Sequence, residues 1–117
     1  FQFYERAAMM GNSLSQMNLA IMYWSGYGTI QDYQKAYAWI SLAVSNGLDD
    51  LERQNKAESI RDLIVINLRH QDNTDTDYHK AKLLASEYYK KYVLHEPSTS
   101  HSNLMYRIGE AIKVLTN

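Results

Sequence analysis

Two glycines that stand one residue apart, Gly26 and Gly28, most constrain what this 117-residue chain can fold into. Glycine adopts left-handed backbone angles that a Cβ atom penalises, so the pair predicts an abrupt end to the preceding helix. Asp32 follows and can cap a new helix by accepting hydrogen bonds from its free N–H groups. An apolar stripe of helical period then runs over residues 36–43. The stretch predicts the tight joint of a helical hairpin.

Parts of this hairpin recur along the chain, which is typical of a helical repeat protein. Phe3, Ala7 and Gly11 are repeated 36 residues later as Trp39, Ala43 and Gly47. The segment 32–36 recurs in part as the segment 77–81, at an offset of 45.

The pattern predicts about six helices and no strands. Expected helices cover residues 1–10, from Asn12 or Ser13 to 25, 32–46, 49–70, from Asp75 or Thr76 to 92, and 102–115. The run 63–68 is apolar enough for a buried strand, but no breaker separates it from the helix before it, so we expect a helix packed between neighbours. The repeat boundaries divide the chain into the second helix of a truncated repeat (1–11), a complete repeat (12–47), a degenerate repeat (48–94) and a terminal capping helix (95–117).

Composition excludes several classes of function. The net charge of −1 gives no reason to expect nucleic acid as a partner, and no apolar run is long enough for direct membrane insertion. The absence of cysteine excludes thiolate metal sites and cysteine nucleophiles. The acidic run 72–77 lacks the glycine and glutamate of a calcium-binding EF-hand, and the four histidines have no ligand spacing. We therefore expect no metal and no cofactor. The first residues carry no signal-peptide pattern, and the sequence does not indicate the cellular compartment of the protein.

The residues of the complete repeat resemble those of the Sel1-like repeat family, a relative of the tetratricopeptide repeat. The resemblance covers residues 3–47 well and 48–94 in part. It implies an all-α fold, an α/α right-handed superhelix, and a non-catalytic scaffold or adaptor that binds a peptide or partner protein on its concave face. Proteins with such repeats occur in the bacterial periplasm and cytoplasm and in the eukaryotic endoplasmic reticulum, so the resemblance leaves the compartment open. The structural residues of the repeat are Leu19, Ala20, Tyr23, Gly26, Gly28, Asp32, Ala36, Trp39, Ala43 and Gly47.

The helix before the joint carries a second apolar stripe opposite its core face. This stripe consists of Leu14, Met17, Ile21 and Trp24. Because tryptophan and methionine are enriched at interface hot spots, we expect these residues to bind the partner, with Trp24 as the anchor. The alternative is that the stripe packs on an adjacent helix.

Two other functions stay open. One is a cell-wall-related enzyme or small-ligand receptor, although the sequence holds no recognisable catalytic motif. Glu58 and Asp62 form the one carboxylate pair at helical spacing, and a solvated face explains it equally well. The other is a structural subunit that forms a homo-oligomer through the N-terminal helix, where Phe1, Phe3, Tyr4 and Met10 would lack part of their cover.

Overall fold

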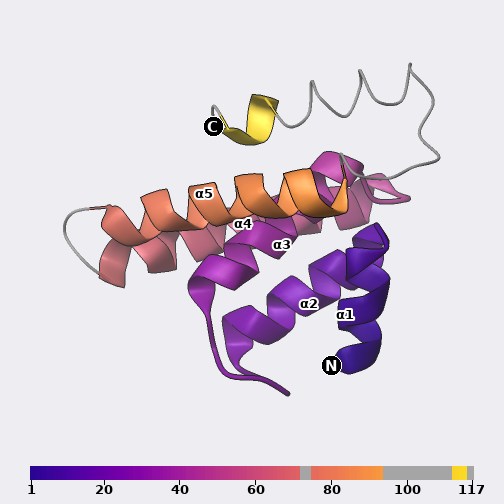
Figure 1. Cartoon of the computed structure of the whole chain (residues 1–117), viewed down its shortest axis with the longest axis horizontal. Helices are drawn as coiled ribbons and strands as arrows, with labels where there is room; N and C mark the ends of the chain where they lie inside the picture. Colours follow the sequence, from indigo (N-terminus) through magenta and orange to yellow (C-terminus); the bar gives the residue numbers. More distant parts are fainter. Residues whose placement is uncertain (72–74, 94–111, 116–117) are drawn as a thin grey trace.

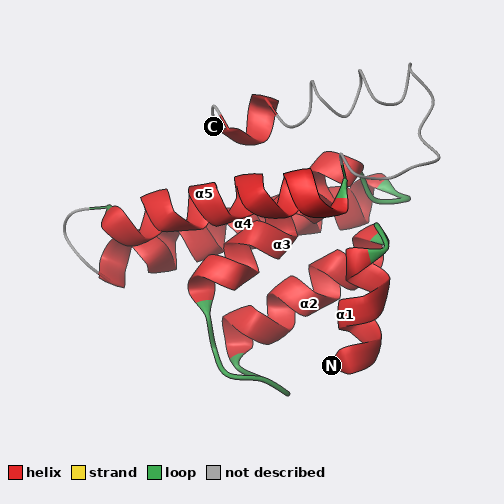
Figure 2. Ribbon diagram, viewed as in Figure 1, coloured by secondary structure: helices red, strands yellow, loops and turns green. Residues whose placement is uncertain are grey.

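The computed structural model describes residues 1–71, 75–93 and 112–115, and these residues form helices and connecting loops without a strand. The expected all-α architecture is thus confirmed. The described residues form five helices and a single helical turn at residues 112–115. The helices are α1 (Gln2–Met9), α2 (Ser13–Ser25), α3 (Tyr33–Asn46), α4 (Leu51–Gln71) and α5 (Thr76–Tyr92). Figures 1 and 2 show α3 inside the bundle, with α1 on the outer side of α2. Most of the helix expected over 102–115 lies outside the described residues.

Side chains cap the two central helices at the expected places. The Asn12 side-chain oxygen accepts a hydrogen bond of 2.8 Å from the backbone N–H of Ser15 at the start of α2. Asp32 does the same for Lys35 at 3.0 Å at the start of α3. Asp75 precedes α5 but makes no side-chain cap. Its backbone is left-handed, and its carboxylate lies 3.4 Å from the guanidinium of Arg69.

The α3 helix lies at the centre of the core. Every residue from Ala36 to Ala43 is buried, so the helix has no wet face over this stretch. It packs against α2, α4 and α5. Figure 1 shows α3 lying between α2 and α5. Trp39 fills the space toward α5, where its ring stacks on Tyr92 at 5.3 Å and meets Tyr88 at 4.9 Å.

A buried amide ties α1 and α3 to α2. The Gln16 side chain is fully buried; its amide nitrogen donates to the backbone oxygen of Ala8 at 3.0 Å. Its amide oxygen accepts a bond of 3.2 Å from Asn46 at the end of α3. Burying an amide is favourable only when its polar atoms are paired, and both are paired here.

The glycine joint has the expected geometry. Gly26 is left-handed, with φ 77° and ψ 12°, and its N–H donates to the Met22 oxygen at 2.8 Å. The N–H of Asp32 then donates to the Tyr23 oxygen at 2.9 Å, which closes the joint. Gly28 has φ 81°, and a Cβ atom there would lie 2.9 Å from the Met22 side chain. A residue with a side chain is therefore strained at either position.

The apolar run in α4 is helical as expected, but it is not covered on all sides. Ile64 and Leu68 are fully buried, whereas Leu63 and Ile66 are about half exposed. The helix packs along α3 and has smaller contacts with α5 and α2, so the side that carries Leu63 and Ile66 is left partly open to water.

Substitution of Gly26 tests the joint. We expect Gly26→Ala to lower the free energy of unfolding by about 1–2 kcal/mol, because alanine is penalised in the left-handed region. Gly26→Asn is a matched control: it adds the same Cβ atom but tolerates this conformation better, so it should cost less. Chemical denaturation of both variants measures the difference. Equal losses would mean that the contact of the new Cβ with Gln31, and not backbone strain, sets the cost.

Candidate protein-interaction surface

The four residues of the predicted binding stripe do not share one environment. Leu14 is 40% exposed, whereas Met17 is only 5% exposed and belongs to the core. Ile21 and Trp24 are half-buried and pack against the core. Met17 lies on the side of α2 that faces the core, so a partner cannot reach its side chain. Three of the four side chains remain accessible.

Trp24 is held in place by α4. Its indole N–H donates a hydrogen bond of 2.9 Å to the side-chain oxygen of Asn67, across 43 residues of sequence. The backbone oxygen of Trp24 also accepts a bond of 2.8 Å from the Gln31 side chain. The hydrogen bond therefore fixes the α2 ring against α4. Trp24 packs on an adjacent helix, as the alternative reading of the stripe predicts, and is still half-accessible.

Leu63 extends the apolar area onto α4. It lies one helical turn before Asn67, on the same side of the helix, and is 47% exposed. On α2, Leu14 and Ile21 are two turns apart on one side. We call Leu14, Ile21, Trp24 and Leu63 the α2–α4 surface. Sequence reasoning missed Leu63, because nothing local indicates which side of α4 faces α2.

An open pocket lies on the opposite flank of α4. It has a volume of about 600 Å³ and is formed by α3, α4, the start of α5 and the turn 112–115. Its lining residues are Tyr37, Ser41, Val44, Ser45, Gln54, Glu58, Arg61, Asp62, Val65, Ile66, Tyr78, Lys113 and Val114. The carboxylate pair Glu58 and Asp62 noted in the sequence thus borders a pocket, together with Arg61. No sequence pattern indicates the remaining lining residues, because they come from four separate segments of the chain.

The pocket's phenol and hydroxyl groups are not arranged as a nucleophile and base. Burial raises the pKa of Tyr37 to about 12, and the nearby Tyr78 contributes. The phenol therefore stays protonated at neutral pH and cannot act as a base. The buried Ser41 hydroxyl opposes this rise but makes no well-formed hydrogen bond among the described residues. No histidine lines the pocket.

The residues predicted to be structural parts of the repeat are buried or have left-handed backbone angles, apart from the helix cap Asp32. Leu19, Ala20, Tyr23, Ala36, Trp39 and Ala43 are buried, and Gly26, Gly28 and Gly47 have positive φ. The Tyr23 ring meets Phe1 edge-on at 5.5 Å. Burial raises the pKa of the Tyr23 phenol, with Glu5 and Asp32 adding to the effect. These residues pack the helical hairpins together, and few of their side-chain atoms are accessible to a ligand.

Metal binding and membrane insertion find no support in the described part of the chain. No three histidine or acidic residues there are grouped to hold a metal ion. His70 and His79 are both exposed, and the acidic run 72–77 lies partly outside the described residues, as do His95 and His101. None of the described helices, α4 included, has the length and apolar character to cross a bilayer.

Comparison with known proteins gives one match. A family model described as Sel1 repeat matches residues 1–12 and 13–48. Searches of curated proteins and of solved structures return no significant match.

Variants of Trp24 test whether its ring packs as described. We expect Trp24→Phe to destabilise the fold by about 1 kcal/mol, because it removes the hydrogen bond to Asn67 but keeps a ring. Trp24→Ala should cost about 2–3 kcal/mol, less than a fully buried tryptophan. Thermal and denaturant unfolding measure both. A double-mutant cycle with Asn67→Ala serves as the control, since additive losses would contradict a direct bond.

Proposed function

We propose that the chain is a non-catalytic scaffold or adaptor module, because its first 48 residues match the model of the Sel1 repeat. Sel1 repeats generally mediate protein–protein interaction. The finer proposal is that a partner protein or peptide binds the α2–α4 surface.

The observation that carries this proposal is an ordered tryptophan beside accessible aliphatic side chains. Trp24 is half-buried and bonded to Asn67, so its ring is already fixed before a partner arrives. Binding to a preorganised group loses less side-chain entropy than binding to a mobile one. Ile21 on α2 and Leu63 on α4 supply apolar area beside it. Aromatic anchors surrounded by such contacts are typical of interface hot spots.

The arrangement of ionisable groups supports a non-catalytic role. Acid–base catalysis needs a group whose pKa lies near the working pH and that stands in a cleft where a substrate can reach it. The described histidines, His70 and His79, are exposed and do not line the pocket. The groups with clearly shifted pKa among the described residues are the phenols of Tyr23, Tyr37 and Tyr88, and all are raised, mainly by burial. Raised phenols stay neutral and provide packing and hydrogen bonds.

Charged substitutions on the α2–α4 surface should abolish partner capture without unfolding the chain. Leu14→Asp combined with Leu63→Asp places two carboxylates on the exposed apolar area, where a partner would have to bury them unpaired. Affinity capture from the cells that express the chain, followed by mass spectrometry, measures which bound proteins are lost. We expect at least a tenfold loss of a specific partner.

The matched control is Leu83→Asp, because Leu83 is an exposed leucine on α5, away from this surface. It should retain the partner. Loss of the partner in both variants, or in neither, would contradict the assignment of this surface.

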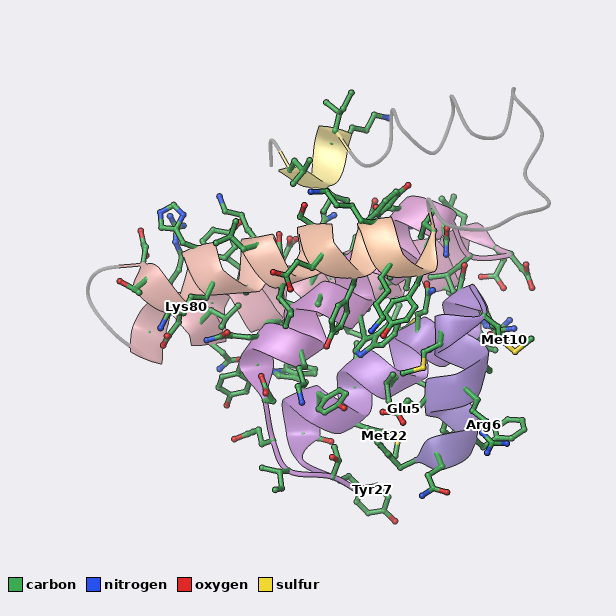
Figure 3. The ribbon with its side chains drawn as sticks, in the orientation of Figure 1. Glu5, Arg6, Met10, Met22, Tyr27 and Lys80 are labelled. Carbon is green, nitrogen blue, oxygen red and sulfur yellow. The ribbon has the colours of Figure 1, made fainter. Side chains whose placement is uncertain are left out.

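A specific observation favours self-association as a second candidate. The outer side of α1 exposes large apolar side chains: Phe3 is 78% exposed and Met10 is 82% exposed, with Tyr4 and Met9 also exposed. Figure 3 shows the Met10 side chain pointing away from the helices. Grouped apolar side chains of this size often mark a protein interface. A second copy of the chain could pair there.

Sedimentation equilibrium tests this candidate. We expect the apparent mass to rise with concentration, and Phe3→Asp with Met10→Asp to weaken dimerisation at least tenfold, because both charges would be buried. Tyr27→Asp is the control, since Tyr27 is equally exposed but sits on the joint (Figure 3). A strict monomer at high concentration would exclude self-association through α1.

A further inference from the structure

The pocket between α3, α4 and α5 is separate from the α2–α4 surface. None of its lining residues comes from α2. Its volume of about 600 Å³ lies within the usual range for sites that bind small molecules. A function for this pocket therefore goes beyond partner binding at Trp24, and either site can fail in experiment while the other stands.

Ser41 places a buried hydroxyl group at the wall of this pocket. The residue is only 3% exposed, and its Oγ makes no well-formed hydrogen bond among the described residues. Buried polar groups are nearly always paired, so an unpaired one calls for a partner. Because Ser41 lines the pocket, a ligand that fills the pocket can supply that hydrogen bond.

Arg61 brings a guanidinium group from α4 to the same part of the pocket. It lies near enough to the Tyr37 phenol, beside Ser41, for its positive charge to oppose the rise in the pKa of that phenol. Its ion pair with Asp62 is weak, because the Nε–Oδ1 distance is 4.0 Å and the Asp62 side chain is 75% exposed. A guanidinium and a hydroxyl donor placed together suit a carboxylate.

A negative group stands next to these donors. Glu58 is half-buried, lines the pocket and lies three residues before Arg61 on α4. Helix residues with this spacing have Cβ atoms about 5–6 Å apart. The ion pairs of the described residues do not join Glu58 to Arg61, so each can bind an opposite charge of a ligand. The two side chains match a carboxylate and an ammonium group that lie on one carbon atom.

Apolar side chains complete the lining beside these charges. Val44 and Val65 are half-buried and pack against the core. Val114, from the turn that forms one wall of the pocket, adds a third aliphatic group. The charged lining residues are two acids and two bases, so the pocket carries no net charge. It therefore suits a ligand that is apolar at one end and zwitterionic at the other.

We propose that this pocket binds a free α-amino acid with an aliphatic side chain. The ligand carboxylate accepts hydrogen bonds from the Arg61 guanidinium and the Ser41 hydroxyl. The ligand ammonium group lies beside the Glu58 carboxylate, and the ligand side chain packs on Val44 and Val65. A peptide carries its terminal carboxylate and ammonium groups at opposite ends, whereas a free amino acid brings both to protein side chains this close together.

Nuclear magnetic resonance titration of the full chain with L-leucine tests the proposal. We expect saturable shifts of backbone amides around the pocket, with a Kd of about 1 mM or lower. Two analogues are matched probes, because 4-methylpentanoate lacks the ammonium group and 3-methylbutylamine lacks the carboxylate. Each should bind about tenfold more weakly than leucine, since it leaves one charged group of the pocket unpaired. This comparison uses the unsubstituted chain and does not depend on the folding of any variant.

Charge-removing variants on α4 identify the groups that bind. Arg61→Gln and Glu58→Gln should each weaken leucine binding about tenfold. Arg53→Gln and Glu52→Gln are the matched controls, because both residues are exposed on α4 outside the pocket, and they should leave binding unchanged. Asp62→Asn should not weaken binding, because it releases Arg61 from its ion pair.

Ser41→Ala separates a ligand-binding hydroxyl from a structural one. It should weaken leucine binding about fivefold and leave the melting temperature unchanged or raised, because it removes a buried polar atom without a partner. Thermal unfolding measures the stability of every variant. The proposal is wrong if leucine causes no saturable shift up to about 10 mM, if both analogues bind as tightly as leucine, or if the Arg61 and Glu58 variants match their controls.

Discussion

The fold depends on one constraint: α3 must be covered on every side. Its residues from Ala36 to Ala43 are all buried. They include Tyr37 and Trp39, whose large rings need aromatic or aliphatic neighbours. Three other helices supply these neighbours, with α2 on one side and α4 and α5 on the others. Small residues such as Ala36 and Ala43 let those helices approach, because close packing fixes how near two backbones can come. The surfaces available for function are therefore on the helices that surround α3.

The α4 helix has a special position among these, because both of its flanks border a candidate site. At its start, the Gln54 side chain donates to the Val44 oxygen at 3.2 Å and accepts from the Leu48 N–H at 2.9 Å. Toward its end, Asn67 accepts the indole N–H of Trp24. Polar bonds thus fix α4 to α3 at one end and to α2 at the other, while Ile64 and Leu68 pack inward. These bonds and contacts fix α4, and therefore also the side chains that it contributes to the α2–α4 surface and to the pocket.

Local features could be predicted from the sequence, and long-range pairings could not. The caps at Asn12 and Asp32 and the left-handed Gly26 act within a few residues, so the residue types alone indicate them. The partners of Trp39 lie about fifty residues away on α5, and no local pattern selects Tyr88 over another aromatic. The same reason explains Met17. A helix with apolar side chains on two sides does not reveal which side a neighbour covers, and Met17 lies on the covered part while Leu14 does not.

The joint at Gly26 and Gly28 contributes to function indirectly, through the direction in which it sends the chain. By ending α2 directly after Trp24 and turning back into α3, it places that ring at the end of the helix, where Gln31 from the joint bonds its backbone oxygen. A longer α2 would carry the chain past Asn67, and a looser joint would leave the indole without a fixed partner. An anchor side chain binds well when it is held before contact. The glycines are therefore needed for the geometry of the α2–α4 surface, although neither contributes a side chain to it.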